Sequence, residues 1–198
     1  MDAKEERWYT VRMNIHTQKE EHEPPCDITC AQPGDGIEIS AIQKAAWLAA
    51  YPDAAVGLTT EDVEAVGIGS PEKLAKWEKS LEEQGEAKHI WVVREEGVMI
   101  GYAVAEKTPD MHELRAIYVL PSHHGKNIGG RLMKCALEWL GDEREVVVWV
   151  FTHNKRAIAF YRKCGFVENG NTSTWDVNGK PIPDLQMIRK IGGGKSAT

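Results

Sequence analysis

The sequence predicts an α/β (α+β) fold in which helices flank a mixed, mostly antiparallel sheet. Short apolar or alternating segments at 90–93, 98–106 and 146–151 indicate strands, and a Glu95-Glu96-Gly97 turn joins the first two as a hairpin. Residues 128–140 carry the most regular helical periodicity. With 198 residues, of which 42% are hydrophobic, the chain is long enough for one domain with a sizeable core.

The first part of the chain predicts an extension followed by the start of the domain. We expect residues 1–25 to be an N-terminal extension in which alternation over 8–17 indicates a possible extra strand. Residues 26–191 are expected to form the domain and 192–198 a flexible tail. Residues 28–31 are the candidate first strand, and apolar residues from Ile39 onward predict a helix that stops at Pro52.

The middle of the chain contains two helix starts and a third strand. Thr60 is expected to cap a short helix with acidic residues in its first turn. Ser70-Pro71 is typical of a helix start, because proline fits the first helical position. After the hairpin and Pro109-Asp110, residues 112–119 are expected to form the third strand of the sheet.

A glycine-rich turn between strand 112–119 and helix 128–140 is the first candidate functional feature. Backbone N–H groups and the positive end of the helix dipole would converge there, which suits an anion such as phosphate. Taken alone, the glycines at 125, 129 and 130 are equally consistent with packing. Gly141 is expected to end the helix.

A second candidate feature follows strand 146–151. Asn154 is a good N-cap for a helix that ends at Gly165, and apolar residues of that helix share one face. Beyond it, 166–177 and 185–191 are expected to be strands separated by an Asn178-Gly179 turn.

Together, the two features resemble the GNAT superfamily of acyl-CoA-dependent N-acyltransferases. The family's phosphate loop, Arg/Gln-x-x-Gly-x-Gly/Ala, falls here on 124–129. Its later signature is met by Asn154, Ala157, Ile158, Phe160, Tyr161, Gly165 and Phe166. The resemblance covers residues 28–191, weakly before Ile90, and implies a GNAT-like sheet whose central strands splay at the CoA site.

Two residues depart from the family's loop pattern. His124 stands where the family usually has Arg or Gln, and we expect weaker CoA binding rather than none, because the loop amides hold the pyrophosphate. Asn127 stands where the family usually has Gly; if that position needs a positive φ, Asn adopts it more readily than most residues.

The resemblance also implies the residues that bind acetyl-CoA. The strand edge 117–119 would hold the pantetheine arm as an added strand, and one of its amides would polarise the thioester carbonyl. Tyr161 matches the family's tyrosine that protonates the leaving sulfur, although a packed aromatic is the alternative. The expected cofactor-binding residues are Ile117, Tyr118, Val119, His124, Gly125, Lys126, Asn127, Ile128, Gly129, Gly130, Asn154, Ala157 and Tyr161, with no metal.

The general base and the acceptor site are less sharply defined. Glu113 is the favoured base, with His112, His123 or no dedicated base as alternatives. Glu113 and His112 should point to opposite faces of their strand, so only one is expected to face the cleft. Trp47 and Tyr51, with Glu113, are the candidate acceptor-binding residues, although Trp47 would also suit the core.

Charge and composition narrow the class of protein. A net charge of −6 argues against broad nucleic-acid binding, and acidic segments at 60–64 and 82–86 suit either a cationic amine or solvated helix faces. No apolar run approaches the roughly 20 residues of a membrane span. The polar N-terminus and the spacing of Cys26, Cys30, Cys135 and Cys164, which fits neither a disulfide framework nor zinc, predict a cytoplasmic protein.

The sequence therefore predicts an N-acetyltransferase that moves an acetyl group from acetyl-CoA to a primary amine. The acceptor would be a small cationic molecule, a polyamine or an aminoglycoside, or a peptide or protein amine. A non-catalytic acyl-CoA-binding sensor or interaction module is the alternative. The altered loop permits that alternative, whereas the intact signature around Asn154 and Tyr161 argues against it. The N-terminal strand would allow a homodimer by extending a neighbour's sheet.

Overall fold

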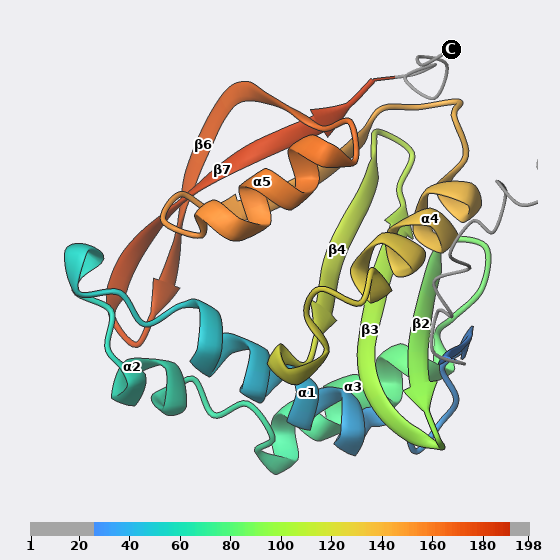
Figure 1. Cartoon of the computed structure of the whole chain (residues 1–198), viewed down its shortest axis with the longest axis horizontal. Coiled ribbons are helices and arrows are strands. Elements are labelled where there is room, and N and C mark those ends of the chain that lie inside the picture. Colours follow the sequence, from blue (N-terminus) through green and yellow to red (C-terminus); the bar gives the residue numbers. More distant parts are fainter. Residues whose placement is uncertain (1–25, 191–198) are drawn as a thin grey trace, which may run out of the picture.

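A computed structural model describes residues 26–190, in which seven strands form one sheet in the order β1-β2-β3-β4-β5-β7-β6 (Figure 1). Neighbouring strands run antiparallel except β4 and β5, which are parallel. The predicted mixed, mostly antiparallel sheet is therefore confirmed. The strand expected at 8–17 and the tail expected at 192–198 lie outside the described residues.

The elements alternate along the chain much as the patterns predict. The strands are β1 (Cys26–Cys30), β2 (Lys88–Glu95), β3 (Val98–Lys107), β4 (His112–Val119), β5 (Val146–Phe151), β6 (Val167–Val177) and β7 (Lys180–Arg189). The helices are α1 (Gly36–Ala50), α2 (Thr60–Ala65), α3 (Pro71–Glu82), α4 (Ile128–Leu140) and α5 (Lys155–Lys163), with 3-10 turns η1 (Ala54–Val56) and η2 (Pro121–His123).

The helix ends follow from capping chemistry, with one correction. The Ser70 side chain accepts a hydrogen bond from the Lys73 amide, as expected of a cap followed by proline. The cap of α2, in contrast, is Thr59 and not Thr60. Thr59 forms a capping box with Asp62, three residues on, and Thr60 has no such partner because Val63 occupies the equivalent place.

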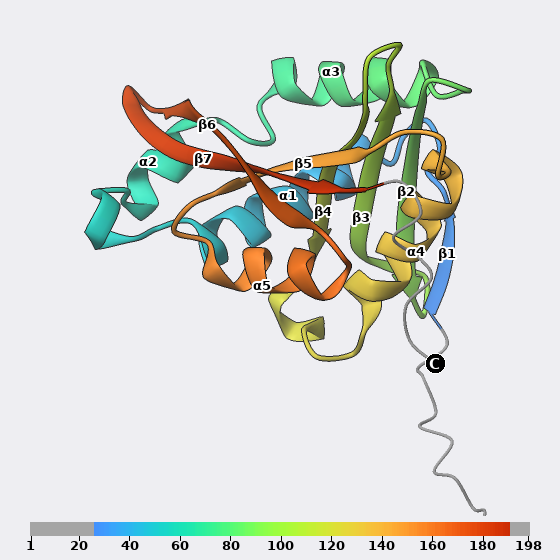
Figure 2. The ribbon, with the colours of Figure 1, turned by 90° about the horizontal axis from the view of Figure 1, so that it is seen from above.

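Two hydrophobic cores lie on opposite faces of the sheet (Figure 2). On one face α4 and α5 pack against the sheet, with Leu132, Ile158 and Phe166 buried among the strand residues. On the other face α1 and α3 pack against β2 and β3, around Ile39 and Tyr102. Each helix places its apolar stripe on the sheet, which is how a helix of this amphipathic kind is stabilised.

The parallel pair β4–β5 is short, and this opens the sheet. The two strands pair only at His112↔Val146 and Glu113↔Val147, near their N-terminal ends. A register shift against β3, at Val104/Ala105, bends β4 just beyond this point. Because no ladder joins β4 to β5 further along, the two strands diverge and leave an opening between them, which residues of both strands line.

A third core fixes the far side of this opening. It joins α1 and α2 to β5 and the β6–β7 hairpin through Trp47, Leu58, Val63, Phe151, Val177 and Ile182. Asp62 reinforces it by accepting hydrogen bonds from Asn178 at 3.0 Å and from Lys180 at 2.5 Å. The hairpin is thereby held over α2. No helix within residues 26–190 is long and apolar enough to cross a membrane.

Candidate active site

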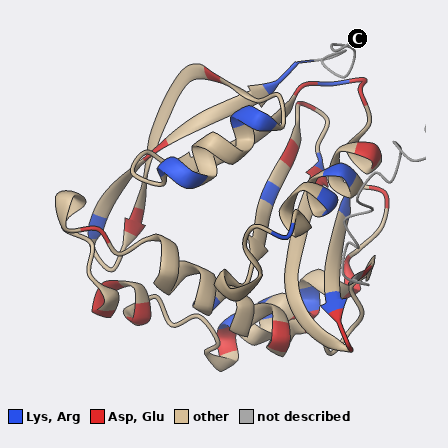
Figure 3. Cartoon of the chain, in the orientation of Figure 1, with Lys and Arg blue, Asp and Glu red and all other residues tan. Residues whose placement is uncertain are grey.

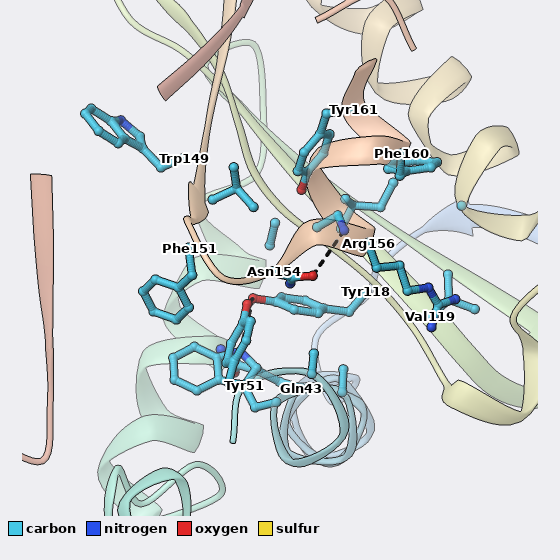
Figure 4. A pocket seen from close by; sticks show the side chains of 18 of the residues that line it. Gln43, Tyr51, Tyr118, Val119, Trp149, Phe151, Asn154, Arg156, Phe160 and Tyr161 are labelled. Carbon is cyan, nitrogen blue, oxygen red and sulfur yellow. Dashed lines mark hydrogen bonds between the residues drawn. The ribbon is translucent and has the colours of Figure 1, made fainter. Parts of the chain in front are cut away.

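An open cleft of about 1670 Å³ occupies the region where β4 and β5 diverge. Its walls come from α1, β4, the turn before α4, β5, α5 and the β6–β7 hairpin (Figure 4). All the site residues expected from the sequence line this cleft except Lys126 and the alternative base His112. The fold therefore collects residues that are spread from Trp47 to Tyr161 in the chain.

The glycine-rich turn has the geometry of an anion-binding loop. Asn127 precedes α4 with φ 56°, in the left-handed region, and Gly125 has φ 88°. The expectation that Asn127 substitutes for glycine in this conformation is confirmed. Because the Asn127 side chain makes no capping hydrogen bond, the amides of the first turn of α4 are left for a ligand. The loop thus fits a phosphate-bearing molecule.

Gly129 in the same loop lies beside α5. A Cβ atom added there would lie 3.5 Å from the Phe160 ring of α5, which is an ordinary van der Waals distance. Packing against α5 therefore does not by itself require glycine at this residue.

His124 is held from two sides. Its Nε2–H donates to the Val119 carbonyl at 3.0 Å, and its Nδ1 accepts a hydrogen bond from the Arg156 guanidinium. Partial burial, and then the charge of Arg156, lower the pKa of His124, which keeps the ring neutral. Arg156, from the first turn of α5, also lines the cleft. The sequence reasoning missed this residue, which places a cation beside the loop where the family usually carries Arg or Gln.

Glu95 pairs with two other residues of the loop. Lys126 forms an ion pair with Glu95 at 3.3 Å, and it is not among the residues that line the cleft. His123 Nε2 lies 2.9 Å from the same carboxylate, and this contact is the main cause that lowers the pKa of Glu95. His123 is therefore engaged in fastening the loop to the end of β2, which weakens its case as a general base.

Tyr161 and Asn154 sit on the α5 side of the cleft. The Asn154 side chain accepts a hydrogen bond from the Ala157 amide at 3.1 Å, so its predicted N-cap role is confirmed. The Tyr161 ring is packed in the core beneath α5, yet the residue borders the cleft, and its hydroxyl points toward Asn154 and Tyr118 (Figure 4). Burial is the largest cause that raises the pKa of Tyr161, so the hydroxyl stays protonated at neutral pH.

On the opposite side, β4 and α1 meet through three aromatic side chains. The Tyr118 hydroxyl accepts a hydrogen bond from Trp47 Nε1 at 3.0 Å and lies 2.9 Å from the Tyr51 hydroxyl. Burial raises the pKa of both tyrosines. Trp47 is part of the third core, as one of its two interpretations expects, and it also lines the cleft, so its role in binding the acceptor stays a prediction.

The two candidate bases at the start of β4 point in different directions, as the alternation of a strand requires. His112 is buried, and it is not among the residues that line the cleft. Glu113 lines the cleft and accepts two hydrogen bonds of 3.1 Å from Arg115. Of these two residues, Glu113 is the one that lines the cleft, and its role as base stays a prediction.

The wall formed by β5 and the β6–β7 hairpin was not expected from the sequence. Trp149 and Phe151 of β5 and Trp175 of β6 line the cleft together with Asp184 of β7. The available signal was the alternation of Ile182, Asp184 and Gln186, which places polar residues on an inward-facing side of a strand. This alternation alone does not predict which face of the sheet borders a ligand-binding cleft.

A splayed sheet with a glycine-rich loop at the start of a helix and a protonated tyrosine beside the opening is the arrangement expected of an acyl-CoA-dependent acyltransferase. Residues 45–166 match the profile of the Acetyltransferase (GNAT) family, and the chain belongs to this family. It is therefore an N-acetyltransferase of the GNAT type, as the sequence predicts.

Several known proteins are similar to this chain. An uncharacterised N-acetyltransferase of Mycobacterium tuberculosis is 33% identical over 105 residues, which are 52% of this chain and 67% of that protein. The coenzyme A complex of the PaiA N-acetyltransferase of Thermoplasma acidophilum has a TM-score of 0.65 at 21% identity and covers 83% of this chain and 98% of that one. The ribosomal-protein-S18-alanine N-acetyltransferase of Escherichia coli has a TM-score of 0.59 at 18% identity, covering 87% and 96%. These two structures share the fold.

Proposed function

We propose that this N-acetyltransferase transfers the acetyl group of acetyl-CoA to a primary amine of a small cationic molecule, such as a polyamine or an aminoglycoside, or to a peptide or protein amine. The observation that carries the proposal is the single cleft that joins the anion-binding loop, the Tyr161 hydroxyl and an aromatic wall bearing carboxylates. A ligand that spans the cleft would contact a phosphate site at one end and a cation site at the other.

Coenzyme A would lie on the side formed by α4 and α5. The amides of Gly125 to Gly130 are suited to its pyrophosphate, with Arg156 as an additional cation, and Asn154 is suited to the arm between phosphate and thioester. The edge of β4 at 117–119 has no partner on the β5 side, so it is open to an extended pantetheine chain. The bound molecule supplies the activated acetyl thioester.

The chain's own residues would then assist acyl transfer. Glu113 would accept the proton that the acceptor nitrogen loses, directly or through water. An amide of 117–119 would donate to the carbonyl oxygen as negative charge develops there. Tyr161 would give its hydroxyl proton to the sulfur as the carbon–sulfur bond breaks, which suits a phenol that burial keeps protonated.

The distribution of charge supports a cationic acceptor. Basic residues gather on α5 (Figure 3), whereas the hairpin side of the cleft contains the carboxylate of Asp184. An anionic cofactor on the α4–α5 side and a cationic amine on the hairpin side would each meet charge of the opposite sign.

The test is a thiol-release assay. The protein is incubated with acetyl-CoA and, separately, with polyamines, aminoglycosides and short peptides, and free CoA thiol is measured against a blank without amine. Thiol release that depends on the amine is expected for at least one cationic class. Coenzyme A alone should raise the melting temperature, since it binds the native state. No thermal shift at millimolar coenzyme A and no thiol release with any amine would refute the proposal.

A further inference from the structure

The side chain of Asp184 is a buried carboxylate in the wall of the cleft. The residue is 7% exposed, and its Oδ1 atom has no hydrogen-bond partner among the described residues. None of the ion pairs formed within residues 26–190 includes it. The backbone amides of Ser173 and Asp184 stabilise the carboxylate in part, but one of its oxygens has no donor and no cation in this part of the chain pairs with it, so the buried charge is only partly compensated.

Gln186, two residues further along β7 on the same face of the strand, is a buried polar residue whose side-chain oxygen does have hydrogen-bond partners. It is equally buried, but its Oε1 atom accepts hydrogen bonds from Asn169 at 2.7 Å and Asn171 at 3.0 Å. Of these two inward-facing polar side chains, Gln186 has hydrogen-bond donors for its oxygen, whereas Asp184 has one oxygen without a donor among residues 26–190. Asp184 is the one that lines the cleft.

Aromatic rings and a hydroxyl surround Asp184 on its face of the sheet. Phe151 of β5 and Ser173 of β6 are its direct cross-strand partners. Trp149 pairs with Gln186 and Trp175 pairs with Ile182. Each tryptophan is therefore a diagonal neighbour of Asp184 on an adjacent strand. Diagonal neighbours lie about 7–8 Å apart, within reach of large aromatic side chains. Faces of Trp and Phe attract cations, so carboxylate and rings favour the same kind of ligand.

The carboxylate suits a nitrogen that stays protonated. Burial raises the pKa of Asp184, against the opposing effect of the Ser173 and Asp184 amides, so the ionised form lacks a counter-charge. An ammonium ion would provide it. The nitrogen that attacks the thioester, however, has to lose its proton, and a buried ion pair would hold that proton in place. A second nitrogen on the same acceptor has no such constraint.

We propose that Asp184 binds a second, non-reacting ammonium group of the acceptor and thereby makes the enzyme select diamines and longer polyamines over monoamines. The inference rests on the proposed function and deepens it. Asp184 is, on this view, a residue that determines specificity, while Tyr161 and Glu113 serve the acyl transfer itself.

The experiment compares diaminobutane with butylamine and with monoacetylated diaminobutane, which keeps one amine and replaces the second ammonium by a neutral amide. For the wild-type protein, kcat/KM for diaminobutane should exceed that for either mono-cation at least about tenfold. Asp184→Asn should raise KM for diaminobutane at least about tenfold, with kcat and the constants for butylamine nearly unchanged. The melting temperature of Asp184→Asn should not fall, since the change removes a buried charge that is only partly compensated.

Asp176→Asn is the matched control. Asp176 lies on the same hairpin and borders the cleft, but it is exposed and already accepts a hydrogen bond from Gly179 at 3.0 Å. This control alters net charge equally and should leave the diamine preference intact. Equal use of diaminobutane and butylamine by the wild type, or equal losses on both in Asp184→Asn, would overturn the inference while leaving acetyl transfer standing. The absence of thiol release with every amine tested, together with no thermal shift by coenzyme A, would instead refute the proposed function.

Discussion

Trp47 donates its indole N–H to the hydroxyl of Tyr118 over 3.0 Å, which joins helix α1 to strand β4 on one side of the cleft. Tyr118 has its backbone in the strand edge expected to bind pantetheine and its side chain in the wall expected to bind the acceptor. One residue therefore contributes to both halves of the site, the first through main-chain atoms and the second through its phenol.

Replacing Tyr118 by Phe should separate these two contributions. Trp47 Nε1 and the Tyr51 hydroxyl would both lose their partner, and we expect a stability loss of about 1–3 kcal/mol in denaturant unfolding. KM for the amine should rise, whereas KM for acetyl-CoA should stay near the wild-type value because the β4 backbone is unchanged. Tyr51→Phe, which spares the Trp47 bond, should cost less. A selective effect on acetyl-CoA would contradict this division.

Asn127 offers a test of the anion-binding loop. With φ 56° it sits in a region that Gly enters freely and most other residues enter at a cost. Asn127→Gly should therefore retain both stability and affinity for coenzyme A. Asn127→Ala should lose about 1 kcal/mol of stability and bind coenzyme A more weakly. Denaturant unfolding measures the stability, and calorimetric titration measures the affinity for coenzyme A. Equal stability and equal affinity of the Gly and Ala variants would show that the positive φ of Asn127 does not matter for the loop.

Local patterns predict most of the elements, because periodicity and capping are short-range properties. Helix 128–140 and its stop at Gly141 are examples. Thr59 could have been recognised as the cap of α2, since only Thr59 has an acidic residue three positions on. Within the site, the residues found from the sequence are those that the resemblance to the family implies, namely its two signatures, the strand edge 117–119 and the candidates Glu113, Trp47 and Tyr51.

Asp184 and Arg156 escaped prediction for a different reason. Asp184 faces the cleft because β7 pairs with both β5 and β6 in a particular register, and Arg156 reaches His124 because α5 packs beside the loop. Both placements depend on pairings between segments far apart in the chain. A single sequence carries no direct record of such pairings.

Lowering the pH should reduce the free energy of unfolding, in part because His124 becomes protonated. Burial and the Arg156 charge lower its pKa in the folded state, so the unfolded chain binds more protons below the ordinary histidine pKa of about 6.5. Stability from this residue is therefore complete above that pH and is lost as the pH falls below it. His89 and His112, whose pKa values burial also lowers, act in the same direction. His124→Gln should lose less stability than wild type between about pH 7.5 and pH 5.5 in denaturant unfolding. A parallel pH dependence in the two proteins would contradict the assignment.

Tyr161→Phe tests the proton donor. The substitution removes one hydroxyl and leaves the ring in the core, so the fold and coenzyme A affinity should persist. Turnover should fall about a hundredfold or more, the usual contribution of a positioned acid. Thiol release reports the rate, and the thermal shift with coenzyme A reports binding. Normal turnover with normal binding would rule out Tyr161 as the acid.

Glu113 is the remaining assignment, and its neighbours provide the control. Glu113 and Glu106 are cross-strand partners, and both carboxylates pair with Arg115, at 3.1 and 3.7 Å respectively. Glu106 also pairs with Lys88 at 3.0 Å, so its charge is compensated on two sides.

If Glu113 takes the proton from the amine, Glu113→Gln should lower kcat about a hundredfold and remove the fall in rate on the acid side of the pH profile. Glu106→Gln changes the same net charge next to the same arginine, and it should leave that limb of the profile in place. An effect shared equally by both variants would mean that the charge around Arg115 matters and that no single carboxylate serves as base. Water or the amine's own equilibrium would then supply the neutral nucleophile, and the acid limb would follow the pKa of the acceptor as amines of different basicity are compared.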